Sequence, residues 1–365
     1  MELSGLCAAL VAGLLTAPAP PADPPAAPEP RTPLRLAAEP GGVAAVDVPL
    51  DSRFEPAGDR YRTSRMPAAR FSMVGFTWDG RREARLRVRV RSDGTWGGWQ
   101  RTERIPGASG SELLWVGRSD AVQVESIDRP VRGLAMTLID PRHVSLPAKA
   151  PAARPDGKPK KPKRAPRPEM HSRKAWGADE RLRERPPRYN RTIQQVHVHH
   201  TVNGNDYKRR DVPGLIRGMY RYHTQNLGWS DIGYNFLVDK FGRIWVGRAG
   251  GPGKPVRGAH TLGFNETSTG IAVIGNYETA WPWKKTRTAI VHLAAWKLDK
   301  YGRNPAGRVR VYSHGSDRFP AGRMVTLPTM DGHRDTNQTA CPGKHLYQKL
   351  PALRKRTAKR VARFS

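Results

Sequence analysis

Apolar positions between residues 31 and 146 follow the two-residue period of a β-strand. The clearest example runs from Ala84 to Arg91, where apolar side chains alternate with four arginines. Such alternation is typical of a strand with one buried face. Asp-Gly pairs at residues 79–80 and 93–94 supply the turns that separate short strands. We therefore predict an all-β, sandwich-like domain of unknown role over residues 31–146.

Two tryptophans, Trp96 and Trp99, follow this arginine ladder. An exposed pair of indole rings could form a platform on which sugars stack. Large aromatic side chains more often fill a core, however. The sequence leaves both interpretations open.

The pattern changes after residue 168, where helical and strand periods alternate. Residues 194–201 read QQVHVHHT, which indicates a buried strand carrying three histidines. From Thr286 to Tyr301 the apolar residues recur with the period of an amphipathic helix, and Gly302 is suited to end it. We predict an α/β domain over residues 169–365, with a central mixed β-sheet flanked by helices. The other expected elements are a helix at 211–223, a hairpin at 234–248, strands at 271–274 and 309–312, and a closing helix at 345–354.

The segment between the two domains, residues 147–168, has a composition that does not favour folding. It contains seven prolines and eight Lys or Arg residues, with Asp156 as its only acid. Such a segment is expected to be an extended, self-repelling linker. The two domains should then have separate cores, and residues 169–365 should fold without the rest of the chain.

The first 30 residues resemble an export signal followed by a Pro/Ala-rich arm. The apolar run from Leu3 to Leu15 is followed by small residues and prolines, although no basic residue precedes it. We predict a signal peptide, and hence a secreted or cell-wall-associated protein. After removal of the signal peptide no integral membrane domain is expected.

Charge and cysteine content narrow the possible partners. The 365 residues include 63 Lys or Arg and 32 Asp or Glu, which gives a formal net charge of +31. This charge fits anionic cell-wall polymers or a nucleic acid. The export signal and the lack of a nucleic-acid-binding motif argue against nucleic acid. The only cysteines are Cys7, within the expected signal peptide, and Cys341, so no disulfide framework is possible.

Ten of the eleven histidines lie at or after His171, so histidine chemistry belongs to the second domain. His197 and His199 are two residues apart on the predicted strand and must share a face, while His200 faces the other way. His333 precedes Cys341 by eight residues in a loop rich in small polar residues. Taken alone, either pattern fits a metal site or hydrogen-bonded core histidines. A binuclear site that includes His197 is a further possibility.

Seven ordered segments resemble the blocks of the peptidoglycan recognition protein family, the zinc-dependent type-2 N-acetylmuramoyl-L-alanine amidases. They span residue 171 to about residue 351, roughly half of the chain, and leave the amino-terminal β-domain outside the resemblance. The segments are HSRKAWGA, VHVHHT, GWSDIGYNFLVD, GRIWVGR, GAHTLGFN, GIAVIGNY and GHRDTNQTACPG.

The resemblance implies a site for one zinc ion per chain, with His199, His333 and Cys341 as ligands. Three protein ligands would leave one tetrahedral position for water, as a catalytic zinc requires. It also implies that Tyr234 and Thr339 are catalytic and stabilise the oxyanion. The residues that it implies for substrate binding are His223, Trp229, Arg248, His260 and Asn265.

The implied function is hydrolysis of the amide between N-acetylmuramic acid and L-alanine in peptidoglycan, by a monomer. Muropeptides would be the substrate. The alternative is a recognition module that binds peptidoglycan without cleaving it, as in relatives that lack the cysteine. The sequence GRAGGPGKP, residues 247–255, departs from the family pattern, and so does the absence of the family's common disulfide. The first departure leaves the preference between diaminopimelate and lysine stem peptides open.

Overall fold

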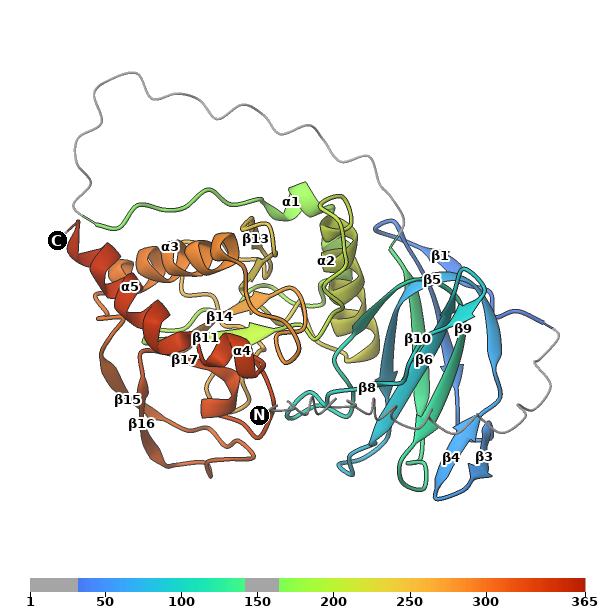
Figure 1. Ribbon diagram of the computed structural model, residues 1–365. Helices are drawn as coiled ribbons and strands as arrows, with labels where there is room; N and C mark the ends of the chain where they lie inside the picture. The colour runs from blue at the N-terminus through green and yellow to red at the C-terminus, as the bar shows by residue number, and fades with distance from the viewer. Residues whose placement is uncertain (1–31, 142–163, 365) are drawn as a thin grey trace, which may run out of the picture.

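The computed structural model describes residues 32–141 and 164–364, and Figure 1 shows a β-domain beside an α/β domain. The predicted signal peptide and residues 147–163 of the predicted linker lie outside the described residues. Within the described part, none of the helices combines the length and the apolar character needed to cross a membrane.

The β-domain is antiparallel, as the alternating pattern predicts. Its path through the sheet is β1-β2-β10-β5-β9-β4-β3, and β6 pairs with β7, β8 and β9. Leu86, Val88 and Val90 of β6 are buried in the core of this domain. The strands are β1 (Ala37–Glu39), β2 (Val43–Pro49), β3 (Phe54–Ala57), β4 (Arg60–Thr63), β5 (Met66–Thr77), β6 (Leu86–Ser92), β7 (Thr95–Trp96), β8 (Gln100–Arg101), β9 (Leu114–Ser126) and β10 (Ala135–Asp140).

The arginine face of β6 is not a plain solvated surface. Arg87 pairs with the buried carboxylate of Glu125 on β9. The guanidinium groups of Arg87 and Arg89 lie over the ring of Trp99, 5.6 and 4.7 Å from its centroid. Arg89 also lies 5.4 Å from the ring centroid of Trp96. Cations therefore lie over both rings, and both tryptophans are partly exposed.

The α/β domain has the predicted mixed sheet, in the order β13-β12-β14-β11-β17. β11 is parallel to both β14 and β17, and the β12–β13 hairpin is antiparallel. The sheet strands are β11 (Gln195–His200), β12 (Phe236–Val238), β13 (Ile244–Val246), β14 (Ser268–Val273) and β17 (Met330–Gly332), and a separate hairpin is formed by β15 (Arg308–Tyr312) and β16 (Met324–Pro328).

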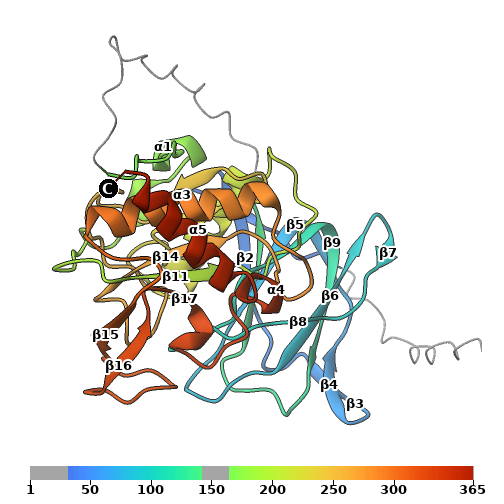
Figure 2. The ribbon, with the colours of Figure 1, turned by 60° about the vertical axis from the view of Figure 1, so that its left-hand side comes forward.

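Helices cover both faces of this sheet. In Figure 2, α3 (Lys284–Lys300) and α5 (Leu350–Ala362) lie in front of β11, β14 and β17. On the other face lies α2 (Val212–Arg221), continued by the π-helical turn η2 (Tyr222–Asn226). The short helices are α1 (Arg173–Trp176), η1 (Glu180–Leu182), η3 (His333–Asp335) and α4 (Lys344–Tyr347).

The closing helix differs from the prediction of one element over residues 345–354. The chain forms α4 and then α5, and Pro351 stands in the first turn of the second helix. Proline is favoured there because the amide that it lacks has no partner within the helix. The last part of the predicted linker also differs, since Ala165 is buried and its amide donates to Asp299 Oδ2 at 2.6 Å. Residues 164–168 therefore pack against α3.

Each domain has a core of its own, as expected from the linker, but a third apolar cluster crosses the boundary between them. Met73 and Ile139 of the β-domain share one apolar cluster with Leu215 and Met219 of α2. The Tyr222 hydroxyl donates to the carbonyl of Phe76 at 2.7 Å across the same boundary.

Charged groups join the domains at the edge of this cluster. Arg221 makes a two-point ion pair with Glu39, both contacts at 2.8 Å. Asp47 accepts hydrogen bonds from Thr137 of its own domain and from Asn226 of the α/β domain. The interface is therefore apolar at its centre and charged at its edge.

Candidate metal centre

β11 carries the first candidate ligand because it is an inner strand with two distinct faces. Val196 and Val198 pack in the cluster that contains α3 and α5. His197 and His199 alternate with them and therefore face the opposite side, as the sequence predicts. Both histidines are buried. His333 begins η3 directly after β17, the strand parallel to β11 on one side.

The segment that follows η3 brings Cys341 close to His199 and His333. The ligand atoms of His199, His333 and Cys341 lie within 4.8 Å of one another, and all three residues are buried. The Sγ atom of Cys341 is 3.7 Å from Nδ1 of His199. The structure thus places the three residues predicted as zinc ligands in one cluster.

The donor set and its unpartnered atoms fit a zinc ion. His333 Nε2 is buried and has no hydrogen-bond partner within the described residues. Two imidazole nitrogens and one sulfur form a donor set typical of catalytic zinc sites. Nε2 of His199 lies 3.0 Å from Nδ1 of His260, which can fix the tautomer that leaves Nδ1 of His199 available as a ligand.

The protonation of these groups follows from their burial. Burial lowers the pKa of His199 well below its usual value and that of His333 to about 3. Both imidazoles are therefore neutral at pH 7, the form that binds metals. Burial raises the pKa of the Cys341 thiol, and a bound cation favours the thiolate instead.

His197 is close to this cluster but has another partner. Its Nδ1 lies against Asp331 Oδ1, and both side chains are fully buried. Burial raises the pKa of Asp331 to about 6. The interaction fixes the His197 ring within the core. Within the described residues, the ligand cluster consists of His199, His333 and Cys341 and does not include His197.

The two predicted catalytic residues make different contacts near the cluster. The ring of Tyr234 is 5.5 Å from the ring of His199, and its hydroxyl donates to Glu112 of the β-domain. Burial raises the pKa of Tyr234 well above its usual value, so the hydroxyl stays protonated. Thr339 is partly exposed, and its Oγ1 accepts a hydrogen bond from the Cys341 amide at 3.1 Å.

A cleft of about 160 Å³ opens beside the cluster and contains three of the five predicted substrate-binding residues. Trp229, His260 and Asn265 line it together with Tyr234 and His333. Two of the three also support their surroundings. His260 contacts His199, and Oδ1 of Asn265 accepts from the amides of residues 260 and 261.

The other two predicted residues lie outside the walls of this cleft. His223 is buried behind Trp229, with ring centroids 4.7 Å apart, and its Nδ1 accepts a hydrogen bond from the Gly233 amide. Arg248 lines a neighbouring pocket and donates to Ser230 Oγ at 3.0 Å.

Comparisons with known proteins identify the family of the α/β domain. Residues 189–344 match the family described as N-acetylmuramoyl-L-alanine amidase. The chain is 31% identical over 153 residues to peptidoglycan-recognition protein SC2 of Drosophila simulans, covering 42% of this chain and 70% of that protein. The chain belongs to the peptidoglycan recognition protein family.

Two further similar proteins are a human enzyme and a solved structure. The N-acetylmuramoyl-L-alanine amidase of Homo sapiens is 32% identical over 187 residues, which are 50% of this chain but only 28% of the human protein. The solved structure of Drosophila PGRP-LB wild-type is 28% identical, with a TM-score of 0.40, and covers 50% of this chain and 92% of that one. Residues 24–166 match a domain described as Rv3811 N-terminal galactose-binding domain-like. This second match agrees with the all-β domain predicted from the alternating pattern.

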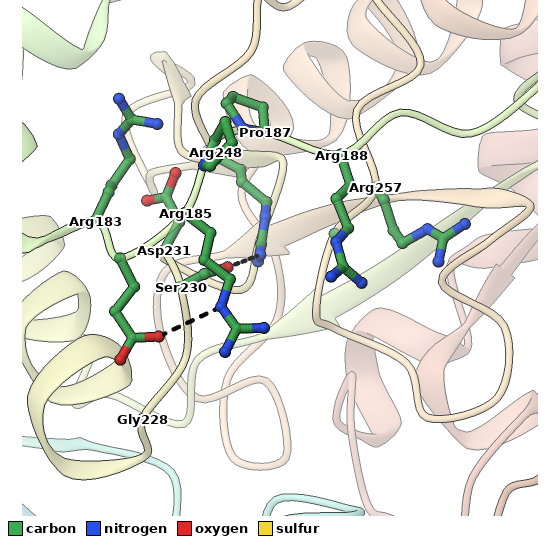
Figure 3. Close-up of a pocket in the computed structure, with 12 residues that line it drawn as sticks. Arg183, Arg185, Pro187, Arg188, Gly228, Ser230, Asp231, Arg248 and Arg257 are labelled. Carbon is green, nitrogen blue, oxygen red and sulfur yellow. Dashed lines mark hydrogen bonds and ion pairs between the residues drawn. The ribbon is translucent and has the colours of Figure 1, made fainter.

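A second pocket, of about 280 Å³, lies beside the cleft of this family member and is rich in arginine. Figure 3 shows the side chains of Arg185, Arg188 and Arg257 among those that line it. Arg183 and Arg248 complete the basic lining, and Glu184 and Asp231 are its acids. We call this space the arginine pocket. Arg183, Arg185 and Arg257 form ion pairs with Glu180, Glu184 and Glu266. Arginine still outnumbers the acids in the lining, so the pocket is a candidate site for an anion.

Sequence reasoning missed residues from both pockets. The cleft is also lined by Ile105, Pro106, Gly107 and Glu112, which all come from the β-domain. No period or motif singles out these residues, because their role depends on contacts with a distant part of the chain. The arginine pocket did have a signal in RLRERPPR, residues 181–188, where four arginines occur in eight residues.

Proposed function

We propose that this protein hydrolyses the amide bond between N-acetylmuramic acid and L-alanine in peptidoglycan, with one zinc ion held by His199, His333 and Cys341. The observation that carries the proposal is the buried His/His/Cys cluster, with its ligand atoms within 4.8 Å, beside a cleft that Tyr234 lines. Membership of the family supports the substrate class. Because Cys341 is present, hydrolysis is favoured over binding alone.

A zinc ion bound there would act as a Lewis acid and lower the pKa of a water molecule. The residues of the chain orient the zinc ligands and the substrate, and they exclude bulk water. The contact of His260 with His199 holds one ligand in position. The Thr339 hydroxyl could stabilise charge that develops on the carbonyl oxygen. Tyr234 lines the cleft, and because its hydroxyl donates to Glu112, its oxygen can accept a hydrogen bond from the amide N–H of the substrate.

The glycan and the stem peptide need more room than the cleft of about 160 Å³ provides. Trp229 offers an apolar wall for a sugar ring or a peptide side chain. Gly228 and Ser230, the neighbours of Trp229 in the chain, line the arginine pocket. We therefore place the carboxylates of the stem peptide in the arginine pocket, where Arg185 and Arg188 are exposed.

The net charge of +31 supports a second, less specific attraction to anionic cell-wall polymers. We propose that the protein is exported and acts on or near the cell wall. Binding to intact cell walls should weaken steeply as salt rises, because the Debye length falls from about 30 Å at 0.01 M to about 3 Å at 1 M. Cleavage of a small soluble muropeptide should depend much less on salt.

The deciding experiment is digestion of purified muropeptides by the zinc-loaded protein, followed by mass spectrometry. Release of peptides with a free L-alanine amino terminus is the expected result. Binding of muropeptides without such release would support the non-catalytic alternative instead.

Variants then test the residues assigned to metal and substrate. His333→Ala should lose zinc and activity, whereas His314→Ala serves as the matched control because His314 is exposed. Arg185→Gln should raise KM for substrates with a free carboxylate and leave zinc content unchanged. An unchanged KM would remove the arginine pocket from the substrate path.

A further inference from the structure

The β-domain contributes one wall of the candidate active site. Its residues 102–113, which we call the cleft segment, connect β8 to β9. Gly107 of this segment lies against Leu262, and Glu103 Oε2 is 3.4 Å from His200 Nε2. The segment therefore contacts the α/β domain at two separate points, Leu262 and His200.

Internal hydrogen bonds fix the shape of the cleft segment. The amide of Glu112 donates to the carbonyl of Glu103 at 2.7 Å, and the amide of Ile105 donates to the carbonyl of Gly110 at 3.0 Å. Ser111 Oγ accepts from the amide of Phe76 on β5 at 3.1 Å. The position of Glu112 is thus set by the β-domain itself.

The carboxyl group of Glu112 faces Tyr234 across the domain boundary. The Tyr234 hydroxyl is 3.3 Å from Oε1 and 3.4 Å from Oε2 of Glu112. Within the described residues no Lys or Arg forms an ion pair with Glu112, although the chain is strongly basic. Burial, followed by the charge of Glu103, raises the pKa of Glu112 to about 8. A carboxyl group held without a cation at the edge of a reactive site suggests a functional role.

A phenol has a single proton to donate and two lone pairs that accept. When Tyr234 donates to Glu112, its proton is directed toward the β-domain. A lone pair of its oxygen is then available for a donor in the cleft, such as the amide N–H of the substrate. Without Glu112, the hydroxyl would rotate about its C–O bond and exchange partners with water.

We propose that Glu112 is a positioning residue, supplied by the β-domain, that fixes the Tyr234 hydroxyl for amide hydrolysis. The inference rests on the proposed function. It gives the β-domain a direct part in the reaction, in addition to any part in targeting. It concerns a residue outside the segment that matches the amidase family, residues 189–344.

The test is a double-mutant cycle in the full-length protein with a purified muropeptide as substrate. Glu112→Ala should lower kcat by roughly 10- to 100-fold and change KM by less than about threefold, because an orienting bond is lost and binding contacts remain. Glu112→Gln keeps an oxygen that can accept from Tyr234 and should recover most of the rate. In a Tyr234→Phe background, Glu112→Ala should have no further effect.

Two measurements separate positioning from simple destabilisation. Zinc content should be unchanged in both single variants, and Glu55→Ala, an exposed acid of the same domain, should behave as the wild type. Thermal unfolding should also be measured without metal for the wild type, the two single variants and the double variant. The melting temperatures should show that Glu112 and Tyr234 are energetically coupled. Should Glu112→Ala fold poorly, Glu112→Asp withdraws the carboxylate by one methylene and should also lower kcat.

The outcomes are distinct. An active wild type with an unchanged kcat in Glu112→Ala would overturn this inference alone, and so would additive effects of the two substitutions. A zinc-loaded wild type that releases no free L-alanine amino terminus would overturn the proposed function and this inference together.

Discussion

The two faces of the five-stranded sheet are both buried, but they are covered in different ways. One face, which we call the helical face, packs Val196 and Val198 against α3 and α5 of the same domain. The other face, which we call the histidine face, carries His197 and His199. The helix on that side, α2, is itself packed against the β-domain. The first face is a closed core. The second combines a metal centre with a domain boundary, so its chemistry depends on parts of the chain that are far apart.

This contrast predicts that substitutions on the two faces fail in different ways. A substitution that shortens a core side chain under the helical face should destabilise the fold and leave the chemistry of the folded molecules intact. A change at the histidine face should affect metal or rate with a smaller effect on folding. The predictions below test that division, in order of the expected effect.

The largest effect is expected for Cys341→Ser. A hydroxyl that is neutral at pH 7 is a poor zinc ligand, so zinc content should fall from one per chain toward zero and hydrolysis should become undetectable. Metal analysis and muropeptide digestion measure the two effects.

The matched change on the other face is Leu293→Ala, at a fully buried position of α3. It should destabilise the protein by about 2 to 5 kcal/mol through lost contacts and a cavity. Its zinc content per folded molecule should stay near one. If Cys341→Ser retained one zinc and normal cleavage, the metal would lie elsewhere and the assignment of the histidine face would be wrong.

The second prediction concerns Tyr234→Phe, which removes one hydroxyl and keeps the ring. The rate should fall by roughly 10² to 10³, the usual effect of losing one group that stabilises the transition state. Zinc content should not change, because Tyr234 is not in the ligand cluster. Unchanged turnover would show that the role of the Tyr234 hydroxyl is purely structural.

The third prediction tests whether the domain boundary is part of the core. A Cβ added at Gly75 of β5 would lie 2.6 Å from Cε2 of Tyr222, which is buried on the side of the α/β domain. Gly75→Val should therefore push the domains apart and destabilise the protein by about 1 to 3 kcal/mol. Gly98→Val is the control, since nothing lies within 4 Å of a Cβ at that position.

Thermal unfolding of both variants gives the comparison. Equal melting temperatures would show that the boundary adds little stability, as the sequence-based expectation of separate cores requires. The shared cluster predicts instead that a fragment of residues 169–365 exposes the apolar side of α2 and is poorly soluble.

The sequence predicts the helical face better than the histidine face, for a physical reason. The helix expected over residues 286–301 is α3, Lys284–Lys300, and the strand expected over 194–201 is β11, Gln195–His200. Their periods are local properties of the chain. The closing helix differs from the prediction because the chain breaks between Tyr347 and Leu350, and Pro351 is then in the first turn of α5.

The candidate site shows the same limit. The grouping of His199, His333 and Cys341 was reached by resemblance to a family, and spacing alone left it open. Glu112 could not have been found in this way because it lies outside the matched blocks, and no pattern in the chain signals a contact with Tyr234. Contacts between domains depend on three-dimensional packing that one-dimensional periods do not encode.

The smallest effect is expected from pH at the edge of the domain boundary. Asp47 is partly buried, which raises its pKa, but hydrogen bonds from Thr137 and Asn226 and the charge of Arg221 outweigh this and lower the pKa below 3.8. An acid whose pKa is lower in the folded state stabilises the fold above its unfolded pKa. That contribution is lost as the pH falls through the folded pKa.

Acid should therefore loosen the boundary below about pH 4 before it affects the helical face. Hydrogen exchange can measure this separately for α2 and α3. Asp47→Asn keeps the shape and removes the titration, so the part of the acid sensitivity of α2 that comes from Asp47 should disappear. The effect should be modest because Asp47 is about half exposed, and solvent screens its charge. If α2 and α3 lost protection from exchange together at every pH, the two faces would unfold as one unit. The domain boundary would then be no less stable to acid than the helical face.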